Sequence, residues 1–253
     1  MISKKDLKYF SSLKEKKIRS IEKKFIVEGN KTVFEAINSN YPCEIILMTF
    51  QFAVENPNVE KILKQRKLNF EIISYRDFYK LADTKNPQGI IGIFKAKSVK
   101  ISEINSNSKI IVFIDEVSDP GNLGTILRNC DWFGIKDILI SYNSTDYLNP
   151  KVIRASMGSI FHLNIFNNIS YDNIYSLKKT GYKIIISDLV GKNIFNFSYP
   201  EKFIITFSSE SKGASKNLKS IADESVTIPK YGNAESLNVG VVSGIILSIL
   251  TKS

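Results

Sequence analysis

Residues 109–128 read KIIVFIDEVSDPGNLGTILR. The first six residues form a nearly continuous β-branched run, which is typical of a strand that is buried on both faces. The residues after them are rich in turn formers, and the apolar spacing becomes helical at Leu123–Phe133. A buried strand that leads through a polar loop into a helix is the repeating unit of parallel α/β sheets.

The same alternation continues to the end of the chain. Further apolar runs of strand length stand at Asp137–Ile140, Leu163–Phe166, Lys183–Ser187, Phe203–Ser208 and Ser225–Ile228. Segments of helix length separate or follow them at Pro150–Phe161, Tyr171–Thr180, Ser215–Ala222 and Leu237–Leu250. We therefore predict an α/β domain over residues 109–253, with a parallel sheet covered by helices.

The part before residue 109 has a different organisation. Residues 98–108 (SVKISEINSNS) are polar and rich in Ser and Asn, which predicts a linker. Residues 1–97 form a separate, smaller α/β or α+β module, because short strand and helix signals alternate along them. Its predicted strands are Lys24–Val27, Cys43–Thr49, Phe70–Ser74 and Ile90–Lys95, and its predicted helices are Thr32–Asn38, Asn58–Arg66 and Phe78–Ala82, after a basic helix or arm at Met1–Arg19.

The positive charge is concentrated in this first module. The chain has a formal net charge of +10. Residues 1–100 hold 20 Lys and Arg against 11 Asp and Glu, whereas residues 101–253 hold 15 against 14. A basic stretch can be an ordinary solvated surface, but such a concentration favours contact with a nucleic acid.

Several other classes of protein are disfavoured. No apolar run reaches the roughly 18 to 20 residues of a membrane span. Cys43 and Cys130 are far apart and form neither a disulfide framework nor a zinc pattern, so we expect a reduced, cytoplasmic setting and no metal. The only histidine, His162, stands in an apolar context and predicts a structural residue rather than a member of a catalytic triad.

The loops after the strands are where a parallel sheet binds ligands. Asp115–Arg128 lacks the G-x-G-x-x-G pattern of dinucleotide sites, and residues 209–215 (SESKGAS) lack the phosphate-loop pattern. Three polar segments remain: Asn122–Arg128, Phe207–Ser215 and Ile228–Gly240. Taken singly, each could be an ordinary helix start, capped by Asn122, Ser215 and Ser236 respectively.

Taken together, these segments resemble the SpoU family of RNA 2′-O-ribose methyltransferases, in the SPOUT superfamily. The three matching motifs are DPGNLGTILRNCDWFGI, FIITFSSESKGAS and IPKYGNAESLNVGVVSGIIL, within Lys109–Leu250. Two phrases of the first module, KKFIVEGNKTVFEAI and DTKNPQGIIGIF, resemble the family's accessory substrate-binding domain over Ser20–Ala96. The resemblance implies a deep C-terminal trefoil knot, a homodimer and an RNA substrate, with ribosomal RNA favoured over transfer RNA.

The resemblance also implies a cofactor and a set of site residues. S-adenosyl-L-methionine would be held in the knot, mainly by backbone groups of the second and third motifs. The implied cofactor-binding residues are Ser208, Ile228 and Leu237, with their neighbours Phe207 and Pro229. The implied catalytic residues are Asn122, Arg128, Glu210, Ser236 and Asn238.

Arg128 corresponds to the family's catalytic arginine. Because a guanidinium stays protonated, we expect it to fix the target phosphate and stabilise alkoxide charge rather than to act as a base. Asn122, Ser236 and Asn238 would form a polar frame around it. Glu210 would anchor the second-motif loop, and one arrangement pairs it with Arg128.

One departure from the family separates two hypotheses. Ser208 and Ser211 replace the two glycines of the usual Gly-x-Glu-Gly, and glycine permits positive φ and close backbone approach. The leading hypothesis is an active RNA ribose methyltransferase. The alternative is a catalytically weak or inactive RNA-binding or ribosome-assembly protein of the same fold. A small-molecule α/β enzyme is disfavoured by the basic module and by the missing nucleotide loops.

Overall fold

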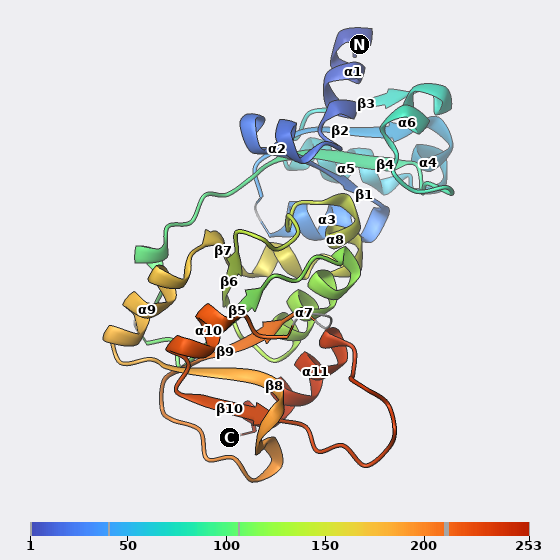
Figure 1. The fold of residues 1–253 in the computed structure, drawn as a ribbon. Coiled ribbons are helices and arrows are strands. Elements are labelled where there is room, and N and C mark those ends of the chain that lie inside the picture. Colours follow the sequence, from blue (N-terminus) through green and yellow to red (C-terminus); the bar gives the residue numbers. More distant parts are fainter. Residues whose placement is uncertain (1, 40, 106, 210–212, 253) are drawn as a thin grey trace. The chain divides into compact units, whose positions relative to one another are not determined.

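We describe the chain from a computed structural model that covers residues 2–39, 41–105, 107–209 and 213–252. It divides into two compact units. The first consists of Met1–Ser98 and Leu148–Phe161, and the second of Val99–Tyr147 and His162–Ser253 (Figure 1). The first unit thus takes in a segment from the middle of the chain, which no sequence pattern indicated.

The second unit is built on a six-stranded parallel sheet with the order β10-β8-β9-β5-β6-β7. The predicted α/β class with a parallel sheet is confirmed. The strands are β5 (Ile110–Asp115), β6 (Asp137–Ser141), β7 (Asn164–Ile169), β8 (Lys183–Asn193), β9 (Phe203–Ser208) and β10 (Glu224–Thr227). β5 and β9 lie side by side at the centre, and their register pairs Asp115 with Ser208 at the carboxyl end.

Helices pack on this sheet (Figure 1). Ile174 and Leu218, one from each of two helices, belong to a buried cluster with Ile111, Phe113 and other strand residues. α7 and α11 pack against each other, and α11 also contacts β9. The helices are α7 (Pro120–Trp132), α9 (Tyr171–Lys179), α10 (Lys216–Ile221) and α11 (Val239–Leu250), with short 3-10 turns η1 (Ile101–Glu103) and η3 (Ile194–Asn196).

The first unit has a four-stranded mixed sheet with the order β1-β4-β2-β3. β4 runs antiparallel to both β1 and β2, whereas β2 and β3 are parallel. The strands are β1 (Lys24–Glu28), β2 (Cys43–Thr49), β3 (Phe70–Ile73) and β4 (Ile90–Lys95). The helices are α1 (Lys4–Ser12), α2 (Lys16–Glu22), α3 (Asn30–Asn38), α4 (Phe50–Glu55), α5 (Asn58–Gln65) and α6 (Tyr75–Leu81). Of these α4 was not predicted, and the single basic helix or arm predicted at Met1–Arg19 is divided into α1 and α2.

The inserted segment Leu148–Phe161 completes the core of the first unit. The single helix predicted for Pro150–Phe161 is wrong, because α8 (Pro150–Ala155) ends before the left-handed turn at Met157 (φ 53°) and Gly158 (φ 94°). The 3-10 turn η2 (Ser159–His162) follows. Within it, the ring of Phe161 stacks on that of Phe25, with their centroids 6.4 Å apart.

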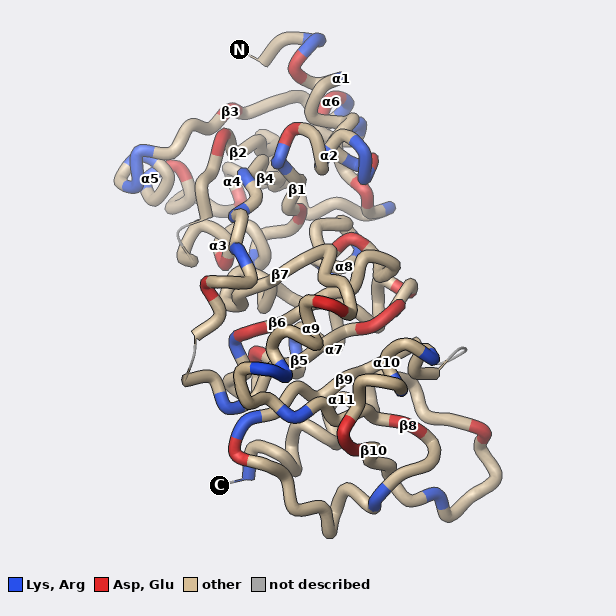
Figure 2. The backbone as a smooth tube through the Cα atoms, turned by 60° about the vertical axis from the view of Figure 1, so that its left-hand side comes forward, with Lys and Arg blue, Asp and Glu red and all other residues tan. Residues whose placement is uncertain are grey.

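Two cations of the first unit form hydrogen bonds within that unit. The Lys14 ammonium donates to the carbonyls of Lys80 and Ala82, and buried Arg19 donates to the carbonyls of Leu13 and Lys14. Other cations remain exposed on α1, α2 and the residues that follow them (Figure 2). These exposed lysines are Lys4, Lys5, Lys8, Lys16, Lys17, Lys23 and Lys31.

Two further findings concern the described ranges. No helix in them is long and apolar enough to cross a membrane. In the same part of the chain, no group of three or more His, Cys, Asp or Glu side chains is arranged to hold a metal ion.

Candidate active site

A pocket of about 500 Å³ opens beside the ends of β9 and β10, between β8 and the loop that leads into α11. Its volume is in the range of small-molecule sites. Apolar and polar side chains share its wall. The apolar ones include Leu189, Ile228, Leu237, Val239 and Val242, and the polar ones include Ser187, Asp188, Ser208, Thr227, Glu235 and Ser236.

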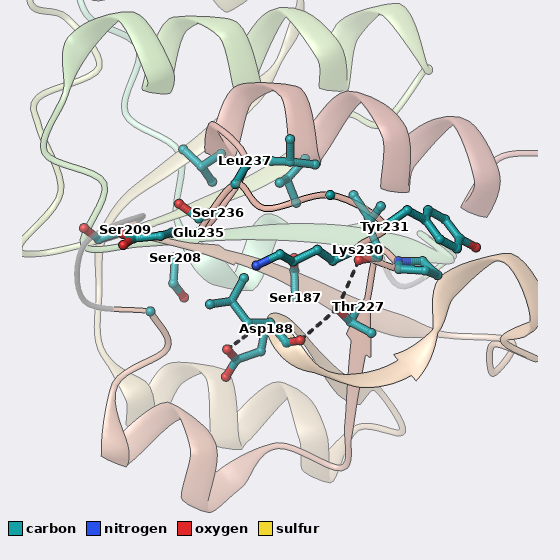
Figure 3. Close-up of a pocket in the computed structure, with 18 of the residues that line it drawn as sticks. Ser187, Asp188, Ser208, Ser209, Thr227, Lys230, Tyr231, Glu235, Ser236 and Leu237 are labelled. Carbon is teal, nitrogen blue, oxygen red and sulfur yellow. Dashed lines mark hydrogen bonds between the residues drawn. The ribbon is translucent and has the colours of Figure 1, made fainter.

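The pocket contains most of the residues that the resemblance implied for cofactor binding. Ser208 comes from the end of β9, and Ile228, Pro229 and Leu237 come from the loop before α11. Figure 3 shows Ser208, Glu235, Ser236 and Leu237 around one side of this pocket. Phe207 is fully buried in β9 and does not line it.

A hydrogen bond joins the first and third motifs. The side-chain amide of Asn238 donates to the side-chain oxygen of Asn122, at 2.8 Å. Asn238 also caps α11, because its side-chain oxygen accepts from the amides of Gly240 and Val241. The cap of α7 is Asp119. Neither Asn122 nor Ser236 therefore acts as a helix cap, so capping does not explain their presence in the motifs.

A second contact between the two helices was not predicted. The Asn129 side-chain amide donates to the carbonyl of Gly240 at 2.8 Å and to the hydroxyl of Ser243 at 2.9 Å. A side chain at position 240 would come within 2.8 Å of Thr125. The small residues of VGVVSGIIL were the sequence signal for this close packing of α7 and α11.

Arg128 lies on the exposed face of α7. Within the described part of the chain its guanidinium has no hydrogen-bond or ion-pair partner, so it is available to an external anion. Glu210, the residue expected to anchor the second motif, lies outside the described residues, as does Ser211. Pairing of Glu210 with Arg128 therefore stays a prediction.

Charged side chains at the pocket were also missed by the sequence analysis. The Asp188 carboxylate forms an ion pair with the Lys219 ammonium, with Oδ2 and Nζ 2.7 Å apart, and both residues line the pocket. Glu235 adds a second carboxylate. Asp188 directly follows the predicted strand Lys183–Ser187, and that position was the available signal.

Ser208 stands where the family usually has glycine, so its backbone conformation decides whether serine is tolerated there. Its φ is not positive, unlike that of five other described non-glycine residues, so serine fits this backbone without strain. Its hydroxyl oxygen is buried and has no partner within the described ranges, although the residue lines the pocket. A buried unpaired hydroxyl is costly, which favours a bound ligand as its partner.

The first-motif loop is fixed to the end of β6. Glu116 has a left-handed backbone (φ 54°), and its amide donates to the hydroxyl of Ser141 at 2.9 Å. The amide of Val117 donates to the hydroxyl of Ser144 at 3.2 Å. Beside them, burial raises the pKa of the Asp115 carboxyl to about 6.

The comparison with protein families explains this arrangement. Residues 109–248 match the model of the SpoU rRNA Methylase family. The chain belongs to this family. Residues 4–92 match the model of an MRM3-like substrate binding domain. The predicted family and its RNA methyltransferase class are thereby confirmed.

Individual relatives agree with the family assignment. The 23S rRNA (guanosine(2553)-2′-O)-methyltransferase RlmP of Bacillus subtilis is 27% identical over 242 residues, which cover 95% of this chain and 94% of that protein. The structure of an AdoMet-bound rRNA methyltransferase from Sinorhizobium meliloti is 26% identical, with a TM-score of 0.87, covering 98% of this chain and 95% of that one. The SpoU methyltransferase AviRb from Streptomyces viridochromogenes, at 20% identity and a TM-score of 0.90 over 99% of this chain and 98% of its own, supports the fold. At the level of the family, the expected cofactor S-adenosyl-L-methionine is also confirmed.

Proposed function

We propose that this SpoU-family protein transfers a methyl group from S-adenosyl-L-methionine to a ribose 2′-hydroxyl of RNA, with ribosomal RNA as the preferred substrate. The observation that carries the proposal is the pocket lined by the second and third motifs, next to the hydrogen bond between Asn122 and Asn238. The names of RlmP and of the Sinorhizobium meliloti enzyme support ribosomal RNA.

The pocket suits S-adenosyl-L-methionine. The cofactor combines a flat adenine, a ribose and a positively charged sulfonium, and it supplies an electrophilic methyl group. Ile228 and Leu237 provide apolar surface for the adenine, and the Ser208 hydroxyl provides an unpaired hydrogen-bonding group. The Glu235 carboxylate attracts the positive charge, whereas that of Asp188 pairs with Lys219.

The chain's own residues mainly position the RNA. Methyl transfer needs the hydroxyl close to the methyl group and aligned with it, which is an orientation task. The exposed Arg128 guanidinium binds a phosphate next to the target ribose and stabilises negative charge that develops on its oxygen. The pair Asn122–Asn238 keeps α7, which carries Arg128, in register with the loop that lines the pocket.

The first unit provides affinity for the RNA in this proposal. Its exposed lysines on α1 and α2 provide phosphate contacts without sequence specificity. Similarity to an MRM3-like substrate binding domain over residues 4–92 supports this role. We place the protein in the cytoplasm, where its free cysteines Cys43 and Cys130 stay reduced.

The proposal includes the homodimer and the C-terminal trefoil knot that the resemblance implies. α7 and α11 pack against each other, and each has an exposed apolar side chain. Trp132 on α7 is 82% exposed and Val241 on α11 is 50% exposed. A second copy would remove this apolar surface from water.

The decisive experiment maps ribose methylation in cellular RNA with and without the protein. One ribosomal nucleotide should lose its 2′-O-methyl group in the deletion strain and regain it when the gene is restored. The purified protein should transfer labelled methyl from S-adenosyl-L-methionine to unmodified ribosomal RNA. Identical maps and no transfer would refute the activity, whereas loss of a transfer-RNA mark would refute the substrate.

The second candidate is an RNA-binding protein with weak or absent catalysis, which the serines of the second motif motivate. Ser208 does not have a positive φ, so replacing the family's glycine with serine causes no backbone strain at this position. Ser211 lies outside the described residues. Calorimetric titration with S-adenosyl-L-methionine separates the two functions. Absence of binding at millimolar cofactor, together with retained RNA binding, would favour the second candidate.

A further inference from the structure

A partly buried hydrogen-bond chain lies beside the pocket, and none of its three residues lines the pocket. Asp115, the last residue of β5, is 1% exposed. The hydroxyl of Tyr171, at the start of α9, donates to the two carboxylate oxygens of Asp115 at 3.1 and 3.2 Å. The hydroxyl of Ser215, the cap of α10, donates to the Tyr171 hydroxyl at 2.9 Å.

The chain ties together the two ends of the second motif. Ser208 stands opposite Asp115 in the ladder between β5 and β9. Ser215 is linked to the Asp115 carboxylate through the Tyr171 hydroxyl. Between these ends, Ser209 and Gly213 line the pocket, and the Gly213 amide donates to the Ser209 carbonyl at 2.8 Å. Asp115 is therefore linked to Ser208 through strand pairing and to Ser215 through its carboxylate, and these two residues flank Ser209 and Gly213.

We propose that Asp115, Tyr171 and Ser215 are positioning residues that hold Ser209 and Gly213 in place for cofactor binding. The identity of the ligand rests on the proposed function. The physical basis is preorganisation: side chains and backbone groups that are held in place before binding lose less conformational entropy when the cofactor enters. The three residues act through this wall segment, and none of them is a catalytic residue.

Tyr182 offers a matched control for Tyr171. Both tyrosines pack in the same hydrophobic cluster. The Tyr182 hydroxyl donates to the carbonyl of Ser108 at 2.7 Å, away from the second motif. Each of Tyr171→Phe and Tyr182→Phe deletes one hydroxyl and keeps the ring. Tyr171→Phe removes the hydrogen bonds to Asp115 and from Ser215, whereas Tyr182→Phe removes the one to Ser108. A merely structural role predicts that both changes lower stability and that neither changes cofactor affinity.

The test measures S-adenosyl-L-methionine affinity of the full chain by calorimetry. Tyr171→Phe should raise Kd about tenfold, as expected when the hydrogen bonds of its hydroxyl are lost, while Tyr182→Phe stays within about twofold. Both should lower Tm, and Tyr171→Phe should lower it more, because it removes more hydrogen bonds. Ser215→Thr, which keeps the hydroxyl, should bind more tightly than Ser215→Ala. Unchanged affinity in Tyr171→Phe, or an equal loss in Tyr182→Phe, would overturn the proposal.

A readout without cofactor separates this inference from the proposed function. Amide hydrogen exchange over Gly213–Leu218 should be faster in Tyr171→Phe than in wild type, and unchanged in Tyr182→Phe. If the wild type bound no S-adenosyl-L-methionine, the proposed function would fail, and this exchange difference would still support the positioning role. Equal exchange in all three proteins would refute the positioning role itself.

Discussion

At the scale of single residues, Arg128 is exposed, and within the described part of the chain it neither packs in the core nor forms an ion pair. We predict that Arg128→Ala lowers methyl transfer to RNA at least a hundredfold, because a phosphate contact and charge stabilisation are both lost. Cofactor affinity should change less than about twofold. Radiolabel transfer and calorimetry measure the two quantities. Equal loss of both would contradict the assigned role.

Asp115 gives a prediction about pH. Its folded-state pKa is about 6, against an ordinary value of 3.8, because burial and the nearby Glu116 outweigh the hydrogen bonds from Tyr171 and Ser141. A raised carboxyl pKa stabilises the fold at low pH, and this stabilisation is lost as pH rises through about 6. At pH 8, Asp115→Asn should therefore be more stable to urea than wild type, by about 2 kcal/mol, and the difference should vanish near pH 4.

Asp223 is the control of opposite sign. Burial alone would raise its pKa, but the backbone amide of Ile184 and the ammonium groups of Lys178 and Lys183 lower it overall. Its stabilising contribution is present at neutral pH and is lost as pH falls below its ordinary value. Asp223→Asn should thus be less stable than wild type at pH 8. The same sign for both variants would show that burial of Asp115 is not the cause.

At the scale of elements, the contact between α7 and α11 connects the first and third motifs. Asn129→Ala removes the hydrogen bonds to Gly240 and Ser243, so the buried hydroxyl oxygen of Ser243 loses the donor that Asn129 supplied. We expect a loss of about 1–3 kcal/mol in unfolding free energy. Thermal unfolding checks this against Asn217→Ala, an exposed change on α10. Equal Tm values would show that the contact adds no stability.

Strand ends were predicted to within one residue, because continuous β-branched runs specify buried strands, except that β7 continues three residues past the predicted Phe166 and β8 continues further still. The exceptions have tertiary causes. β8 continues to Asn193, well beyond the predicted Ser187, because it pairs there with β10 across a register shift. α8 stops at Ala155, because the chain turns left-handed to bring Phe161 onto Phe25.

Some site residues were predicted from the sequence, and others were not. The resemblance to the SpoU family implied Ser208, Ser236 and Asn238, which lie at or beside the pocket. Asp188, Asn129 and Asp115 were missed, because a common polar residue acquires its role only from the partner that folding brings near. No local pattern names the partner, such as Tyr171 for Asp115.

At the scale of the whole molecule, the exposed lysines of α1 should govern how RNA binding depends on salt. Replacing Lys4, Lys5 and Lys8 with Gln should reduce the slope of log affinity against log salt by about 1–2, because fewer phosphates are neutralised. The control replaces three exposed lysines of the second unit, Lys109, Lys179 and Lys252, and should keep the slope. Equal slopes in wild type and the α1 variant would assign this charge to solvation alone.

The insertion of Leu148–Phe161 into the first unit has a consequence for dissecting the protein. The predicted boundary at residues 98–108 suggests two fragments that could be expressed separately. Residues 1–98 alone would lack Phe161, the stacking partner of Phe25, and Arg154, whose guanidinium pairs with Asp83 at 2.7 Å. The complementary fragment would expose Val152 and Ile153, which are buried in the intact chain. Each fragment would thus carry part of the first unit's core, and we expect the two pieces to assemble when they are co-expressed.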